Sequence, residues 1–292
     1  MNQSGFLFLT GATGHTGSRI AKRLVEQGRR VRCLVRTAQH ARFLPQSDQL
    51  TIIHGDLDHP KGLSTHVRGA SAVVHAANIG FAEAVVRLCE EASVRRVIAL
   101  SSTRRFTRFP DPSARRVIAG EATLEASALD TTILRPPMIY GGDRDNNVQR
   151  LVNWLNRHSW MPLVDGGRNL VQPIFVWDLV DGVARVLERP RQTAGRALTI
   201  AGPRAMPMRE MVEIIAARMG RRIRWFPAPY WCALTAAGMM ERMMRKPSAT
   251  RDQVRRLLED KVFSIEEASK ALGGWAPRPF EEGIRLKLEG GA

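Results

Sequence analysis

The chain has 292 residues, 44% of them hydrophobic and 25% charged, a composition typical of a globular protein with one large or two smaller domains. Lys and Arg exceed Asp and Glu by 16, but only six of the 44 cations are Lys and the Arg are scattered, so nucleic-acid binding is not favoured. Three separated cysteines without CxxC spacing argue against a disulfide framework or a metal site and favour a cytoplasmic protein, and no apolar run approaches the ~20 residues that span a bilayer.

The first half of the chain alternates short apolar runs with amphipathic stretches of helical length. The runs are mostly continuous apolar runs without alternation, which indicates strands buried on both faces of a parallel sheet. This order predicts βαβ units and a doubly wound, parallel α/β Rossmann sheet. The predicted strands are residues 6–10, 31–35, 50–54, 72–77, 96–101 and 131–135, and the predicted helices are 17–27, 60–68, 79–92 and 113–127.

After about residue 140 helical patterns dominate. We therefore predict a nucleotide-binding domain (1–145 plus about 172–201) and a smaller, mostly helical C-terminal substrate or cap region (about 146–171 and 202–292). The predicted helices in this half are 146–158, 178–188, 207–219, 230–244, 249–260 and 265–272, and the two predicted strands are 174–176 and 197–201.

A glycine-rich loop follows the first predicted strand and opens the first predicted helix. Gly11 permits a tight turn, Gly14 lets a pyrophosphate approach the backbone, and Gly17 lets the helix pack close to the sheet. The amino terminus of the helix offers unpaired N–H groups and a positive dipole end to the phosphates. The predicted cofactor-binding residues of this loop are Gly11, Ala12, Thr13, Gly14, His15, Thr16 and Gly17.

The Gly-x-x-Gly-x-x-Gly spacing resembles the short-chain dehydrogenase/reductase superfamily, especially its extended and atypical branches. Segments 73–77, 100–102, 132–141, 173–178 and 272–284 are similar to other signatures of that superfamily. The resemblance implies a Rossmann fold that binds NAD(P). It also implies a set of cofactor-binding residues: Asp56 and Leu57 at the adenine, Ala76 and Ala77 beside the fourth strand, Ser101 at the end of the fifth, and Pro136 and Pro137 under the nicotinamide.

The end of the second predicted strand bears on which nicotinamide cofactor is bound. An NAD-binding dinucleotide fold usually has an acidic residue here, which binds the ribose of the adenosine. This chain instead has Arg36 followed by Thr37. A guanidinium can pair with a 2′-phosphate and stack on adenine, so the sequence favours NADP(H) over NAD(H). In the alternative interpretation, Arg36 is a solvated charge at the end of a strand.

The superfamily's usual catalytic pair, a Tyr followed four residues later by a Lys, does not occur in this chain. The two tyrosines are followed at that distance by Arg144 and Leu234. Glu121 matches an acid of the extended members, which places Ser113 at the expected Tyr position and Val117 at the expected Lys position. The usual route of ketone–alcohol redox is therefore in doubt, although the cofactor itself carries the hydride.

Two other residues are candidates for catalysis. Thr103 stands where the superfamily usually has a Ser or Thr, and could hydrogen-bond a substrate carbonyl. Tyr140 could reach the nicotinamide end of the cleft and donate a proton; the alternative is a turn residue that packs over the cofactor. His75 lies within an apolar run and is interpreted as a core histidine.

The cap contains an aromatic segment at 225–231, followed by an apolar helix with four Met between 239 and 244. Such residues can line an apolar substrate site, rest on a membrane, form a dimer face or belong to the core. The helix after the fourth strand begins almost directly after Asn78, without the longer loop of sugar-nucleotide epimerases, so a sugar-nucleotide substrate is less favoured.

Two functions follow from these observations. The first is an NADP(H)-binding atypical short-chain oxidoreductase that acts on a small apolar, carbonyl or quinone-like substrate without the Tyr–Lys pair. The second is a non-catalytic NADP(H)-binding regulator or assembly factor. A homodimer and a peripheral membrane contact remain open alternatives for either function.

Overall fold

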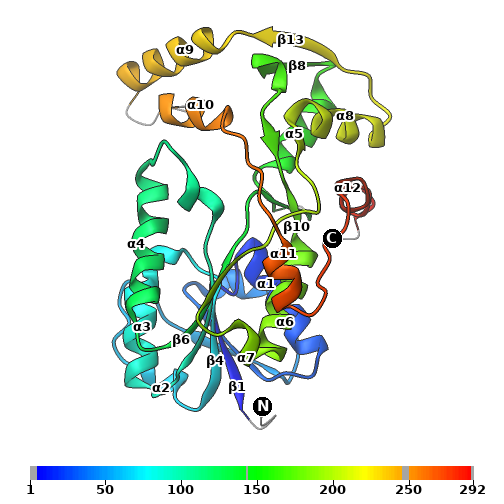
Figure 1. The fold of residues 1–292 in the computed structure, drawn as a ribbon. Helices are drawn as coiled ribbons and strands as arrows, with labels where there is room; N and C mark the ends of the chain where they lie inside the picture. The colour runs from blue at the N-terminus through cyan, green and yellow to red at the C-terminus, as the bar shows by residue number, and fades with distance from the viewer. Residues whose placement is uncertain (1–4, 143, 245–249, 291–292) are drawn as a thin grey trace.

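The computed structural model describes residues 5–142, 144–244 and 250–290 (Figure 1). Seven parallel strands form the central sheet in the order β11-β6-β5-β4-β1-β2-β3. The predicted doubly wound parallel sheet is confirmed. The strands are β1 (Phe6–Thr10), β2 (Val31–Val35), β3 (Leu50–His54), β4 (Ala70–His75), β5 (Arg96–Leu100), β6 (Asp130–Arg135) and β11 (Arg196–Thr199).

Helices cover both faces of this sheet. On one face, α1 (His15–Glu26) packs against α6 (Val176–Glu188), and α7 (Pro190–Thr193) and α11 (Glu266–Ala271) lie on the same side. On the other face lie α2 (Ser64–Val67), α3 (Ala82–Glu91) and α4 (Pro112–Ala126), with α3 packed against its two neighbours. Each face has its own buried apolar core, which explains the continuous apolar runs of the strands. Short 3₁₀ helices follow four of the strands: η1 (Ala38–Phe43), η2 (Ile79–Phe81), η3 (Thr103–Phe106) and η4 (Asp165–Gly167).

The cap stands at the carboxyl ends of the strands and has a third apolar core. Its helices are α5 (Val148–Arg157), α8 (Met208–Arg218), α9 (Tyr230–Met243), α10 (Arg251–Leu257) and α12 (Phe280–Leu288). Three two-stranded sheets join them: β7 (Ile139–Tyr140) with β10 (Ile174–Phe175), β9 (Leu170–Val171) with β12 (Met206–Pro207), and β8 (Trp160–Val164) with β13 (Arg224–Ala228).

The prediction was incomplete in the cap. It missed the short strands β7, β9 and β12, the strands β8 and β13, and the helix α12. β8 and β13 each contain a proline, which argues against a strand in a sequence pattern. The predicted helix at 60–68 is only the four residues of α2, and the predicted helix at 249–260 is shorter, as α10 begins at Arg251 and residue 249 lies outside the described residues. Within the described ranges, no helix has the length and apolar character needed to cross a bilayer.

Candidate functional site

Two glycines of the glycine-rich loop, Gly11 and Gly17, have no room for a side chain. Gly11 has φ +67°, and a Cβ there would lie 2.6 Å from the carbonyl oxygen of Ala76. A Cβ on Gly17 would overlap the carbonyl oxygen of Gly11. Gly14 donates its N–H to Gly11 O at 3.0 Å and begins α1 without a side-chain cap. A ligand can therefore approach the backbone of the loop closely, and the loop ends at the amino terminus of α1. This arrangement fits a pyrophosphate.

A cleft of about 420 Å³ opens beside this loop. It lies at the carboxyl edge of the sheet between β1 and β4, where the strand order reverses, and this is the ligand-binding position of doubly wound folds. Its size is within the range of small-molecule sites. The predicted cofactor residues that line it are Gly14, His15, Thr16, Ala76, Ala77, Ser101, Pro136 and Pro137.

The other predicted cofactor residues lie around this cleft. Arg36 and Thr37 are exposed directly after β2, and Asp56 and Leu57 follow β3. Since β1, β2 and β3 are adjacent and parallel, these residues reach the same edge of the sheet as the glycine loop. Asp56 is half-buried and accepts a hydrogen bond from the next residue but one, while Leu57 is buried.

Residues at the positions of the missing catalytic pair line the cleft. Ser113 and Val117 are one helical turn apart on α4, and both face this space. Arg104, from η3, also lines the cleft and donates from Nη1 to Ser113 Oγ at 2.8 Å. A cationic hydrogen-bond donor therefore lies beside Ser113, the residue that the resemblance to the superfamily places at the expected tyrosine position.

The structure places the two predicted catalytic residues away from the cleft wall. Thr103 is only 8% exposed, and its N–H donates to Pro136 O. Tyr140 is 1% exposed in the cap core, between the rings of Phe175 and Phe280. Its hydroxyl lies 3.5 Å from Phe280 O, and burial raises its pKa further above the ordinary value. Tyr140 as a proton donor at the nicotinamide is therefore corrected to a core residue.

His75 is a core histidine, in agreement with its interpretation from the sequence. Its ring is fully buried between the Thr10 hydroxyl, 2.7 Å from Nδ1, and the carbonyl of Asn78, 3.1 Å from Nε2. Burial lowers its pKa to about 4, so the ring is neutral at physiological pH. The two contacts of His75 hold the end of β1 beside the loop that follows β4.

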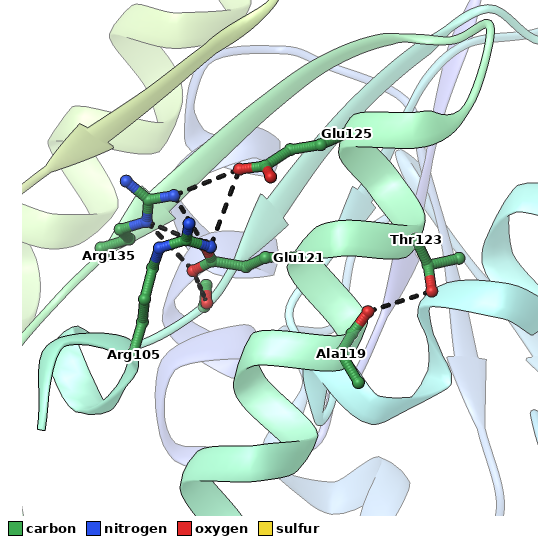
Figure 2. Close-up of polar contacts among 7 residues, drawn as sticks. Arg105, Ala119, Glu121, Thr123, Glu125 and Arg135 are labelled. Carbon is green, nitrogen blue, oxygen red and sulfur yellow. Dashed lines mark hydrogen bonds and ion pairs between the residues drawn. The ribbon is translucent and has the colours of Figure 1, made fainter. Parts of the chain in front are cut away.

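A buried ion cluster supports the floor of the cleft (Figure 2). The carboxylate of Glu121, on α4, is fully buried and accepts hydrogen bonds from Arg135 and Arg105, each at 2.6 Å to Oε2. Ser101, which lines the cleft, donates its hydroxyl to Glu121 Oε1. Glu125 adds a second, half-exposed carboxylate 3.3 Å from Arg135. The cluster fixes the ends of β5 and β6 against α4.

The loop after β7 closes over the glycine loop. Arg144 donates to Thr13 O at 3.0 Å and to Ser18 Oγ at 2.6 Å. His15 donates from Nε2 to Gly141 O at 2.6 Å, and burial lowers the pKa of this imidazole. These contacts place a cation and a neutral histidine at the pyrophosphate end of the cleft.

A buried ion pair holds this loop in place. Asp145 accepts backbone N–H groups of Gly141, Asn147 and Gln149, which fixes both sides of the turn. Lys287, from α12, lies 2.8 Å from the same carboxylate, and both side chains are at most 2% exposed. The last helix of the cap is therefore tied directly to the loop that contacts the glycine loop.

Sequence reasoning missed several of these residues. Arg104 and Arg144 line the cleft, but neither belongs to a motif that indicates a cofactor or substrate contact. Ser102 also lines it, and its position next to Ser101 at the end of a strand was an available signal. Among the described residues, no group of His, Cys, Asp or Glu is arranged to hold a metal ion.

Comparison with known proteins identifies related chains. Residues 11–154 match a family model described as NAD(P)H-binding. The chain is 23% identical to a "4-hydroxy-2-methyl-3-oxo-4-farnesyl-3,4-dihydroquinoline-1-oxide ketoreductase" of Stigmatella aurantiaca, over 97% of this chain and 96% of that protein. It is 21% identical to NADH dehydrogenase (ubiquinone) 1 alpha subcomplex subunit 9 of Arabidopsis thaliana, over 81% of this chain and 63% of that one. The structure of MoeE5 in complex with UDP-glucose and NAD has the same fold, with a TM-score of 0.76 and 20% identity over 98% of both chains.

Proposed function

Because the chain belongs to the short-chain dehydrogenase/reductase superfamily, in its extended and atypical branches, we propose that it is an NADP(H)-dependent reductase of an apolar carbonyl or quinone-like substrate. The observation that carries this proposal is the pairing of Arg104 with Ser113 on the cleft wall, at the position where the superfamily has its tyrosine. Hydride transfer needs a polarised carbonyl oxygen, and this pair offers it a charged donor without a tyrosine or lysine.

The residues present fit a dinucleotide. The bare cradle from Gly11 to Gly17 and the amino terminus of α1 would hold the pyrophosphate, and Arg36 would pair with the 2′-phosphate. Pro136 and Pro137 line the cleft where the chain leaves β6, and would lie under the nicotinamide. The bound cofactor supplies a hydride to the carbonyl carbon of the substrate.

Arg104 would stabilise the negative charge that grows on the substrate oxygen during reduction. It lines the cleft and keeps its guanidinium oriented through the hydrogen bond to Ser113 Oγ. A guanidinium cannot itself release a proton at physiological pH. The proton that completes the alcohol would come from water, with the Ser113 hydroxyl in position to pass it on.

The substrate class rests on a relative and on the lining of the cleft. The name of the Stigmatella aurantiaca relative describes reduction of a keto group on a farnesyl-bearing ring. The cleft itself is lined in part by apolar side chains, among them Leu100, Val117 and Ile139, which suit an apolar substrate. The 3₁₀ helix η2 starts directly after Asn78, without room for the longer loop expected for a sugar nucleotide.

Arg36→Ala should weaken NADPH binding ~10–100-fold, because it removes the charged partner of the 2′-phosphate, and should leave NADH binding unchanged. Titration of both cofactors by calorimetry measures this difference. Arg68→Ala is the matched control, since Arg68 is also exposed but lies before β4, at the opposite edge of the sheet. Equal NADPH affinity in Arg36→Ala and wild type would remove the assignment of NADP(H).

Arg104→Gln should lower kcat/KM ~10–100-fold in the oxidation of NADPH by quinones, enones and ketones, because it removes a charged donor to the reacting oxygen. Loss of absorbance of the reduced nicotinamide gives the rate, and the NADPH affinity should not change. Tyr140→Phe is the control and should turn over at the wild-type rate, because its hydroxyl lies in the cap core. A fully active Arg104→Gln would contradict the proposed role.

A second candidate function is a non-catalytic NADP(H)-binding subunit or regulator. It is favoured by Ser113 and Val117, which leave the usual catalytic positions without a phenol or an ammonium, and by the similarity to a subunit of NADH dehydrogenase. The same assay separates the two functions. Strong thermal stabilisation by NADPH without turnover of any tested substrate would support the regulator.

A further inference from the structure

Several large apolar side chains of the cap are exposed. They come from β8, β13 and α9, which Figure 1 draws together at the end of the molecule opposite the amino terminus. Single exposed apolar residues are common, but several large ones on neighbouring elements mark an interaction site. The five members, here called the Trp–Met surface, are Trp160 (43% exposed), Phe226 (62%), Trp231 (69%), Met239 (56%) and Met243 (84%).

The strand part of this surface is one face of a two-stranded sheet. Trp160 pairs in register with Arg224, and Pro162 pairs with Phe226. Alternate residues of β8 are buried in the cap core, so the residues between them point outward. The rings of Trp160 and Phe226 meet edge to face, with centroids 6.3 Å apart. The outward face thus combines aromatic rings with an exposed guanidinium.

The helical part is a stripe along α9. Trp231, Met239 and Met243 are separated by eight and four residues, which places them on one side of the helix. The helix packs its other side on α10, where Gly238 lies against the guanidinium of Arg251. The packing of α9 therefore leaves Trp231, Met239 and Met243 exposed to solvent.

The charge around the Trp–Met surface is strongly positive. Residues 218–244 contain five Arg and a single acid, Glu241, which accepts the backbone N–H of Arg251. Arg224 lies on the same sheet face as Trp160, and Arg157, at the end of α5, is exposed close to it in the chain. The apolar side chains are thus accompanied by cations with almost no acidic neighbour in the sequence.

We propose that the Trp–Met surface docks the cap on an anionic lipid bilayer. Trp and Phe partition into the interfacial region of a bilayer, and Met and Phe can enter its acyl boundary. The arginines would contact anionic headgroups, which attract juxtamembrane cations within about a Debye length. Charge complementarity selects an anionic bilayer over a neutral one.

Two other binding partners, a second copy of this chain and single-stranded nucleic acid, fit the Trp–Met surface less well. A twofold contact between copies of this chain would bring the same arginines together with one acid per copy, which is repulsive. Single-stranded nucleic acid would stack on Trp160 and Phe226, but Met239 and Met243 offer no planar surface for a base. A bilayer can contact both the strand part and the helical part of the Trp–Met surface.

The test is vesicle flotation of the full chain, with vesicles of phosphatidylcholine alone and of phosphatidylcholine with one-third phosphatidylglycerol. Wild type should float with the anionic vesicles only, and should be released at high salt. The double variants Phe226→Ser/Trp231→Ser and Arg222→Ser/Arg224→Ser should each bind ~10-fold more weakly. Ile52→Ser, at a side chain 38% exposed on β3, is the control and should float like wild type. NADPH affinity, measured without vesicles, should be equal in all variants.

Four results would overturn the proposal. The first is that wild type floats with neither vesicle type. The second is that the variants float as well as wild type. The third is a dimer, seen by sedimentation equilibrium, that only the Phe226→Ser/Trp231→Ser variant loses. The fourth is an oligonucleotide that binds wild type while the vesicles do not. None of these readouts depends on turnover, so failure here is distinct from failure of the proposed reductase activity.

Discussion

Gly11→Ala should abolish measurable NADPH binding, with a loss of at least ~100-fold in affinity. The added Cβ would lie 2.6 Å from Ala76 O and 2.5 Å from the carbonyl carbon of the same residue. The residue also has φ +67°, where an alanine costs roughly 1–2 kcal/mol. The loop must then move away from the end of β4, which removes the backbone cradle for the pyrophosphate. Calorimetric titration with NADPH measures the loss.

Gly28→Ala is the matched control for backbone strain. Gly28 has φ +70°, but a Cβ there would meet no atom within 4 Å. It should lower the free energy of unfolding by about 1 kcal/mol and leave NADPH affinity unchanged. The comparison separates the conformational cost of a left-handed residue from the close approach at Gly11. A Gly11→Ala protein that binds NADPH with wild-type affinity would contradict the proposed contact between this loop and the pyrophosphate.

Glu121→Gln should lower the free energy of unfolding by about 3–5 kcal/mol. The substitution removes the negative charge that Arg135 and Arg105 share, and leaves two cations beside a fully buried amide. Denaturation in urea measures the change, with an unaltered dependence on urea concentration as evidence that the same folded state unfolds. Because the cluster is buried, the loss should persist at high salt.

Glu125→Gln is the control for this prediction. Its carboxylate contacts the same two arginines at 3.3 and 3.9 Å, but its side chain is 45% exposed. Water compensates for the loss of an exposed ion pair, so the expected change is about 0–1 kcal/mol. Similar losses in both variants would show that the cluster does not depend on the buried carboxylate.

The sheet could be predicted closely because its signals are local. Phe6–Thr10, Val31–Val35 and Leu50–His54 are mostly apolar runs, and the structure has strands at these positions. The cap strands could not be predicted in this way. β8 contains Pro162 and is held by pairing with β13, some sixty residues later, which no short sequence window shows.

The candidate site also has one part that local sequence signals predict and another part that depends on distant contacts. The glycine loop is a local motif, and its geometry follows from steric limits on the residues themselves. The Arg104–Ser113 pair exists because η3 and the start of α4 fold back beside the ends of β5 and β6, which spacing alone does not indicate. Tyr140 was misplaced because the chain turns into β7 directly after β6, and two residues give no readable alternation between cleft and core.

The buried pair of Lys287 and Asp145 has a consequence for the synthesis of the protein. A ribosome releases the Rossmann half first, and its sheet can form while the cap is still being translated. The loop that bears Arg144 is held by the charge of Lys287, on α12, which follows the Rossmann strands in the chain. The contacts of Arg144 with the glycine loop thus depend on a helix that is translated well after these strands, and cofactor binding reports that α12 has docked on the loop.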